Sequence, residues 1–139
     1  MEISDVRKRV FGTIEGAKRQ AVERRARADQ AARAYATFLE SVAVPIFKQV
    51  ANVLRAEGMT FNVFTPGGSV RLASDRRTED YIELTLETET DQPFVKGHTC
   101  RSRGGRVVES EEAIGSPEAL TEDEVLSFVL KGLEPFLER

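Results

Sequence analysis

The first 57 residues constrain the fold most, because residues 4–57 have the composition of one very long helix. The segment is rich in Ala, Arg, Glu and Gln, which are good helix formers. Ser4 or Asp5 can cap its start, and Gly58 can end it in the left-handed conformation. From residue 4 to residue 44 such a helix measures ~60 Å. The residues after Gly58 predict a body only ~30 Å across, so about half of the helix would extend beyond it.

Apolar residues recur every seven positions along this helix, a pattern typical of a helix that packs against another helix. We call the resulting stripe the seam. Its two series, offset by three, are Ile14, Ala21, Ala28, Tyr35 and Val42, and Ile3, Val10, Ala17, Ala31 and Phe38. Arg7 and Arg24 interrupt the seam. Alanine dominates its middle, so a partner helix can approach closely.

Three residues disfavour a single straight helix. Gly12 and Gly16 each destabilise a helix by roughly 1 kcal/mol relative to Ala. Pro45 has no amide hydrogen, and its ring clashes with the carbonyl of Ser41 in a regular helix, so we expect a kink or break near Pro45. The alternative to an extended helix is a hairpin broken near Gly12 or Gly16. The apolar stripe after the proline should pack on a sheet; it comprises Ile46, Phe47, Val50, Val53 and Leu54.

From Met59 onwards the apolar period changes to two, which indicates strands. The expected strands begin at Phe61, Val70, Tyr81, Phe94 and Arg106, and short glycine-containing turns separate several of them. Short connections favour an antiparallel meander. In the clearest strand, residues 81–88, Ile82, Leu84 and Leu86 share one face and should lie in the core.

A C-terminal helix is expected to begin at Thr121, because Thr121 and Glu124 form a capping box. One apolar face should follow, consisting of Val125, Leu126, Val129, Leu130, Leu133 and Leu137. The sequence therefore predicts an α+β fold with a long N-terminal helix, kinked near Pro45, a five-stranded antiparallel meander and a C-terminal helix packed on the sheet. We expect residues 1–58 to form an oligomerisation helix and residues 59–139 to complete the same single domain.

Charge is distributed unevenly along the chain. The formal net charge is −3, but residues 1–58 carry +4 and residues 59–139 carry −7. A basic half joined to an acidic half indicates either an anionic partner or attraction between the halves, within a chain or between chains. The single Cys100 allows no internal disulfide, and the longest mostly apolar run, residues 42–47, is too short for a membrane span. We therefore expect a cytoplasmic protein without membrane contact.

Two groups of residues are candidates for ligand binding. His98 and Cys100 share a strand face and resemble a nucleophile and base in type, but their Cβ atoms should lie ~6–7 Å apart. Two ligands are also too few for zinc, so we expect structural roles, no metal and no cofactor. Arg101, Arg103 and Arg106 crowd one glycine turn and can bind a phosphate or carboxylate. With His98 they are the anion-binding candidates.

The middle of the long helix is basic and is a candidate nucleic-acid surface. The residues concerned are Lys18, Arg19, Arg24, Arg25, Arg27 and Arg33. Acidic Glu15, Glu23 and Asp29 interrupt them, and no aromatic residue lies between them to stack on a base. This pattern favours a solvated or intersubunit face.

These observations support three functional hypotheses. The leading one is a non-enzymatic interaction or assembly protein that forms a helix-mediated homo-oligomer, a dimer, and can bind a protein partner. The second is a nucleic-acid-associated factor that uses the basic helix. The third is a small-ligand-binding domain or minor enzyme with a site near His98.

Overall fold

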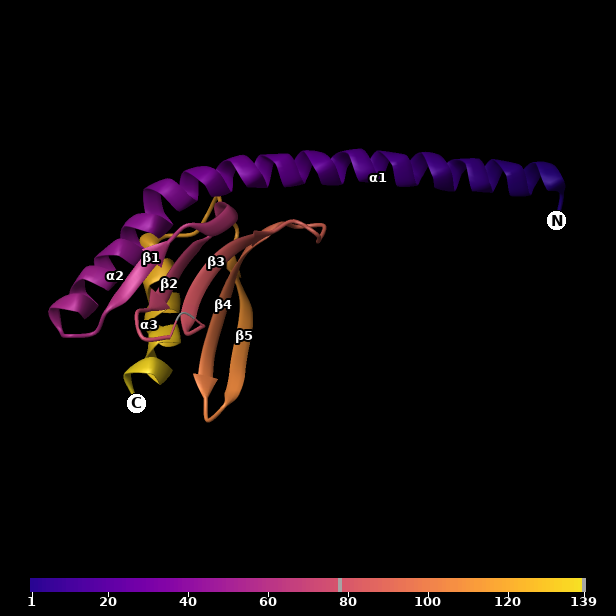
Figure 1. The fold of residues 1–139 in the computed structure, drawn as a ribbon. Coiled ribbons are helices and arrows are strands. Elements are labelled where there is room, and N and C mark those ends of the chain that lie inside the picture. The colour runs from indigo at the N-terminus through magenta and orange to yellow at the C-terminus, as the bar shows by residue number, and fades with distance from the viewer. Residues whose placement is uncertain (78, 139) are drawn as a thin grey trace.

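A computed structural model describes residues 1–77 and 79–138. The chain begins with helix α1 (Ile3–Phe38), passes through the π-helical segment η1 (Leu39–Ala43) and continues as helix α2 (Val44–Ala56). The three segments follow one another without a loop, and the helix axis changes direction where α1 gives way to α2 (Figure 1). The helix is uninterrupted at Gly12 and Gly16, so the hairpin alternative is not formed.

The π-helical segment is how the helix accommodates Pro45. Its last turn is closed by a hydrogen bond from the Val44 amide to the Leu39 carbonyl, five residues earlier. Pro45 then lies in the first turn of α2, where its missing amide hydrogen costs least. A π turn of this kind is a common cause of a bend. The expected disturbance near Pro45 is therefore a bend rather than a break.

The sheet is a five-stranded antiparallel meander in the order β1-β2-β3-β4-β5, as the sequence predicts. Its strands are β1 (Phe61–Phe64), β2 (Val70–Ser74), β3 (Tyr81–Glu87), β4 (Phe94–Arg103) and β5 (Arg106–Gly115). The single-turn 3₁₀ helix η2 (Pro66–Gly68) joins β1 to β2. Strands β4 and β5 are longer than the ranges that the sequence predicts, which are residues 94–101 and 106–110. Gly104 and Gly105, with φ of 56° and 79°, form a two-residue turn that lets pairing begin at Arg103 and Arg106.

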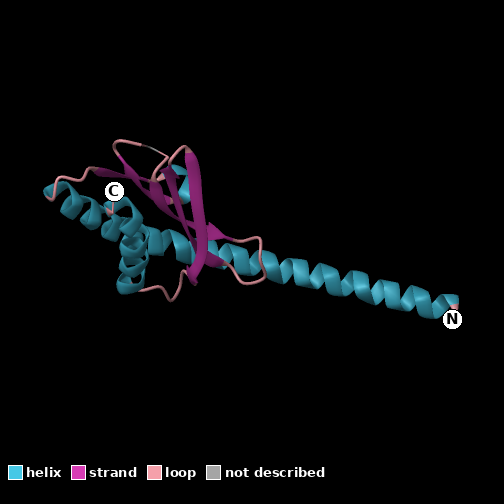
Figure 2. Cartoon of the chain, turned by 90° about the horizontal axis from the view of Figure 1, so that it is seen from below, coloured by secondary structure: helices cyan, strands magenta, loops and turns pink. Residues whose placement is uncertain are grey.

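Helices α2 and α3 (Glu122–Leu137) cover one face of the sheet, and α1 extends away from it (Figure 2). The predicted capping box is present, since the Thr121 hydroxyl and the Glu124 carboxylate each accept a hydrogen bond from the other's backbone amide. The predicted apolar face of α3 is wrong at two positions. Leu130 and Leu137 are 51% and 46% exposed, whereas Phe128, which lies outside the predicted face, is buried.

Gly97 explains why Phe128 is part of the core. It lies in β4 on the face that α3 covers, and a Cβ atom there would lie 2.3 Å from Phe128 Cε1. The aromatic ring therefore occupies the space that a side chain at position 97 would need. The absence of a side chain at Gly97 also explains why the helix-covered face of β4 does not look apolar in sequence.

Leu84 is at the centre of the core, with no exposed surface. Leu84→Ala should lower the free energy of unfolding by roughly 2–5 kcal/mol, because it removes buried methyl groups and leaves a cavity. Urea denaturation followed by circular dichroism measures this change. Leu130→Ala is the matched control and should cost under about 1 kcal/mol, since Leu130 is half exposed. Equal losses in the two variants would contradict this assignment of the core.

Gly97→Ala should destabilise the protein by about 1–3 kcal/mol, because the new methyl group forces Phe128 out of its position. The same substitution at Gly12 is the control. No atom lies within 4 Å of a Cβ built there, and Ala is the better helix former, so Gly12→Ala should not lower the free energy of unfolding. A Gly97→Ala variant as stable as the native protein would show that Phe128 does not need this space.

Candidate functional site

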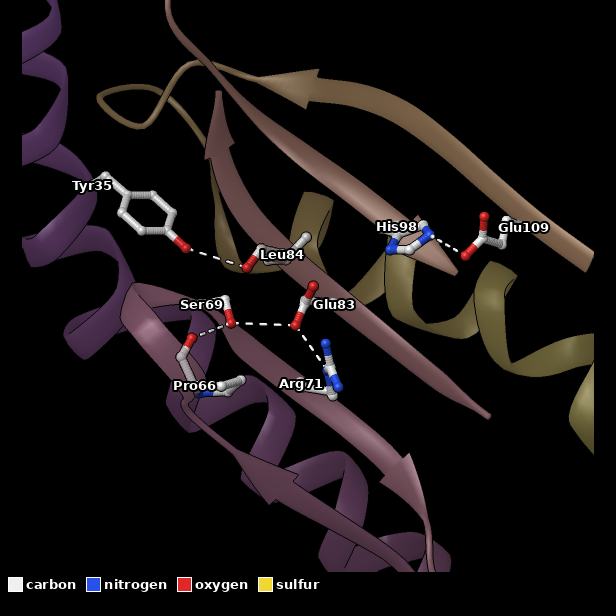
Figure 3. Close-up of polar contacts among 8 residues, drawn as sticks. All are labelled: Tyr35, Pro66, Ser69, Arg71, Glu83, Leu84, His98 and Glu109. Atoms are coloured by element: carbon white, nitrogen blue, oxygen red, sulfur yellow. Dashed lines mark hydrogen bonds and ion pairs between the residues drawn. The ribbon is translucent and has the colours of Figure 1, made fainter. Parts of the chain in front are cut away.

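The C-terminal half of α1 is fixed to the sheet through its apolar seam. Ala31, Tyr35 and Phe38 are buried there. The Tyr35 hydroxyl donates a hydrogen bond of 3.3 Å to the backbone carbonyl of Leu84 in β3 (Figure 3). Burial, followed by the nearby Glu83 carboxylate, raises the pKa of Tyr35 to about 12. A buried, neutral Tyr35 thus joins the long helix directly to the central strand.

A second contact fixes α1 about two to three turns closer to its N-terminus than Tyr35. The loop between β3 and β4 reaches α1, where Arg24 Nε lies 3.2 Å from Asp91 Oδ1. Arg27 Nε donates a hydrogen bond of 2.9 Å to the Asp91 backbone carbonyl. Both side chains of the Arg24–Asp91 pair are at least half exposed, so the pair adds little stability. It does mark the point where α1 leaves the body.

Residues 3–23 of α1, which we call the overhang, project beyond this contact (Figures 1 and 2). They measure about 31 Å at 1.5 Å per residue. Within the described chain, no hydrogen bond or ion pair links the overhang to any residue outside α1, apart from backbone bonds at its first turn. Six large apolar side chains are nevertheless exposed on it, namely Ile3, Val6, Val10, Phe11, Ile14 and Val22.

Three of these exposed residues continue the seam that is buried farther along the same helix. Ile14 belongs to the same seven-residue series as Tyr35, and Ile3 and Val10 belong to the same series as Phe38. A straight helix drifts about 20° per heptad against such a repeat, so the seam turns by about 60° around α1 between Ile14 and Tyr35 and by about 100° between Ile3 and Phe38. The seam therefore packs on the sheet at one end and faces solvent at the other.

The six basic residues proposed for nucleic-acid contact do not form a uniform surface. Arg24 and Arg27 bind Asp91, and Lys18 lies 4.0 Å from Glu15. The remaining three, Arg19, Arg25 and Arg33, are exposed. At about 100° per residue, Glu15 and Asp29 share their side of the helix. That side of the helix therefore carries both positive and negative charges. Two of the six basic residues, Arg24 and Arg27, bind the β3–β4 loop instead.

The anion-binding candidates are divided between two faces of the sheet. The register pairs Arg103 with Arg106 and Arg101 with Val108, which places the three arginines on the helix-covered side. His98 lies on the opposite, open face. Arg101 lines a hollow of about 310 Å³ between β4, β5 and α3, and Arg103 lines a different one.

The hollow at Arg103 is the larger, with a volume of about 650 Å³. Arg76 and Arg77 from the β2–β3 loop join Arg103 there, over a floor that includes Phe61 and Phe136, whose rings meet edge to face at 6.1 Å. Reasoning from sequence missed the first two arginines because they lie about 25 positions before Arg103. The arrangement combines an apolar floor with positive charge, but Asp75 and the buried Asp80 line it as well.

The open face of the sheet carries a connected polar network (Figure 3). Arg71 Nε lies 2.8 Å from Glu83 Oε2, and the Ser69 hydroxyl lies 3.3 Å from the same oxygen. Glu83 is only 8% exposed. The sequence suggests a solvated Glu83, because alternation along β3 directs it away from the core. The missing signal is the register, which sets Arg71 directly opposite it on β2.

The network continues toward β5 through ring contacts. The Arg71 guanidinium lies 3.9 Å from the centre of the Tyr81 ring, and Tyr81 meets His98 edge to face at 5.5 Å. His98 Nε2 is 3.7 Å from Glu109 Oε1. No buried side-chain nitrogen or oxygen in the described residues lacks a hydrogen-bond partner. These groups satisfy one another, which suits them to stiffen the sheet.

Cys100 lies in the same network but is not activated. Burial raises the pKa of its thiol, the nearby Glu109 carboxylate raises it further, and the Tyr81 hydroxyl opposes the shift only in part. Nucleophilic attack requires the thiolate, which a raised pKa disfavours at neutral pH. His98 and Cys100 share a face as predicted, yet this geometry makes the thiol a poor nucleophile.

Neither a metal site nor a membrane span is found in the described residues. No group of three or more His, Cys, Asp or Glu side chains in residues 1–77 and 79–138 is placed to hold a metal ion. Over the same ranges, no helix combines the length and the apolar character needed to cross a bilayer. No known protein family, no curated protein and no solved structure matches this chain.

Tyr35 gives the anchor of α1 a testable pH dependence. Its folded pKa of about 12 exceeds the usual 10.0, so its contribution to stability is complete below pH 10 and is lost as pH rises toward 12. At pH 8, Tyr35→Phe should cost about 0.5–1.5 kcal/mol for the lost hydrogen bond. At pH 11 the native protein should have lost about 1.4 kcal/mol more than the variant. Urea denaturation at both pH values measures this, and equal losses would contradict it.

Proposed function

We propose that this chain is a non-enzymatic interaction or assembly protein whose N-terminal helix joins two copies into a homodimer. The exposed seam of the overhang is the observation that carries this proposal. Soluble proteins rarely leave a contiguous row of large apolar side chains in water, and such a row marks an interaction surface. On the overhang, Ile3 and Phe11 are 81% and 63% exposed.

The overhang also lacks what normally keeps a helix folded. Helices shorter than about 12–15 residues are marginal in water, and longer ones still depend mainly on tertiary packing of an apolar face. As far as the structure describes the chain, every side chain of the overhang except Ala21 is exposed, and the overhang contains Gly12 and Gly16. A partner helix supplies the missing packing, and Ala17 and Ala21 on the seam let it approach closely.

A second copy of the chain is the partner we favour, because the exposed seam of one copy can pack against the exposed seam of the other. The seam is self-complementary in character, with large residues near the start and alanines farther along. Two-fold dimers, in which the same patch of both subunits meets, are the commonest oligomers. The opposite net charges of residues 1–58 and 59–139 also favour association between copies. We further propose a cytoplasmic location, since the one thiol, Cys100, is free and buried.

Val10→Asp should weaken the dimer by roughly a hundredfold, because each copy loses a buried valine and gains a charge in the seam. Sedimentation equilibrium at micromolar concentration measures the shift toward the 15.5 kDa monomer. Val22→Asp is a closely matched control. Val22 is 57% exposed, against 53% for Val10, but lies off the seam, so its dimer should be unchanged. Deleting residues 1–16 should also yield monomers.

Circular dichroism on the same samples provides a second readout. Dilution to monomer should reduce the helical signal of the native protein, because the unpacked overhang loses its stabilising partner. A native protein that remains a 15.5 kDa monomer at all micromolar concentrations would refute the proposal. So would a dimer that Val10→Asp and Val22→Asp weaken equally.

A further inference from the structure

We infer that the two overhangs pair in antiparallel fashion, with Val10 of each copy facing the partner's Ile14, so that the two bodies lie at opposite ends of the dimer. This inference rests on the proposed dimerisation and adds its direction and register. It follows from where the body sits on α1, how long the overhang is and how charge is placed along the seam.

The position of the body excludes a parallel, in-register pair. Ala31, Tyr35 and Phe38 of the seam are already packed on the sheet of their own chain. Paired helices stay adjacent at a small crossing angle of about 20°. A parallel, in-register partner that follows the seam would therefore meet Ala31, Tyr35 and Phe38, against which the sheet is already packed. An antiparallel partner meets only the overhang.

The length of the overhang selects one register among the antiparallel ones. In one register, Val10 faces the partner's Ile14 and Ile3 faces the partner's Ala21, so the residue numbers of each facing pair add up to 24. This register covers the whole overhang. A shift of one heptad toward longer overlap would set the partner's Ile3 against Ala28, beside the bonded pair of Arg27 and Asp91. The opposite shift would leave Ala17 and Ala21 uncovered.

Charge along the seam favours the same arrangement. A parallel pair would oppose Arg7 to the partner's Arg7 in the apolar interface. In the antiparallel register Arg7 faces the partner's Ala17, whose small side chain leaves room for the arginine stem. The basic residues of the partner's first turns then come within about two helical turns of the β3–β4 loop, where the Asp91 side chain is 76% exposed.

Phe11 also acquires a role in this register. It lies beside the seam and is 63% exposed. The two-fold axis passes near residue 12, so Phe11 of each copy lies next to the partner's Phe11. Two aromatic rings at the centre of an interface are a favourable arrangement, because they bury large apolar surfaces and pack edge to face or offset.

Distances between spin labels test the inference on the full-length chain. Arg25→Cys and Thr13→Cys are each introduced with Cys100→Ala and labelled with a nitroxide, and electron spin resonance measures the distance between the two copies. Positions 25 are 26 residues apart along the paired helices, so the labels should be about 39 Å apart. The Thr13→Cys labels lie near the two-fold axis and should be within about 20 Å. Circular dichroism that matches the native protein verifies the fold of each variant. If Cys100→Ala misfolds, the labels are introduced with Cys100 retained, because its thiol is buried.

The other possible outcomes distinguish a failure of the register from a failure of the proposed function. Short distances at both positions would establish a parallel dimer and overturn the inference while leaving the proposed function standing. A heptad shift in register would move the Arg25→Cys distance to about 28 or 50 Å, and would overturn the register. A dimer with the Thr13→Cys labels far apart would place the contact elsewhere, for example at the outer edge of β5. A monomer with no dipolar coupling would overturn the proposed function itself.

Discussion

The packing of Tyr35 and Phe38 onto the sheet is the interaction on which the rest of the architecture depends. It fixes the direction in which α1 leaves the sheet. It also buries the C-terminal end of the seam in the core of the same chain. Because the helix continues toward its N-terminus beyond Arg24 without further contact to the sheet, the N-terminal end of the seam remains exposed. The apolar surface of the overhang is thus a direct consequence of one intramolecular contact combined with excess helix length.

Most of the architecture could be predicted from local sequence patterns. The period-two residues of β3, the capping box at Thr121 and the paired glycines after Arg103 each specify one element with little dependence on its surroundings. The seam was also visible, since a seven-residue repeat needs no tertiary information. The sequence could not show which part of the seam is covered by its own chain, because that depends on where the sheet docks.

The errors arose where two distant segments meet. Phe128 became core and Leu130 became exposed because Gly97, some thirty positions earlier, leaves space for an aromatic ring. Glu83 became buried because Arg71 lies opposite it on the neighbouring strand. Arg103 joined Arg76 and Arg77 for the same kind of reason. Such pairings follow from strand register and helix placement, which no single segment encodes.

The π turn at Leu39–Ala43 sets the rotational phase between the two halves of the long helix. Before this turn, the buried positions follow the seam through Tyr35 and Phe38. After it, Ala43, Ile46 and Phe47 are buried, and Ala43 and Ile46 lie one residue later than the seven-residue repeat would place them. The extra residue absorbs that mismatch, so both halves bury a face against one body. A deletion of one residue here would turn the overhang by about 100° about its axis relative to α2. A single codon therefore controls which way the exposed end of the seam points.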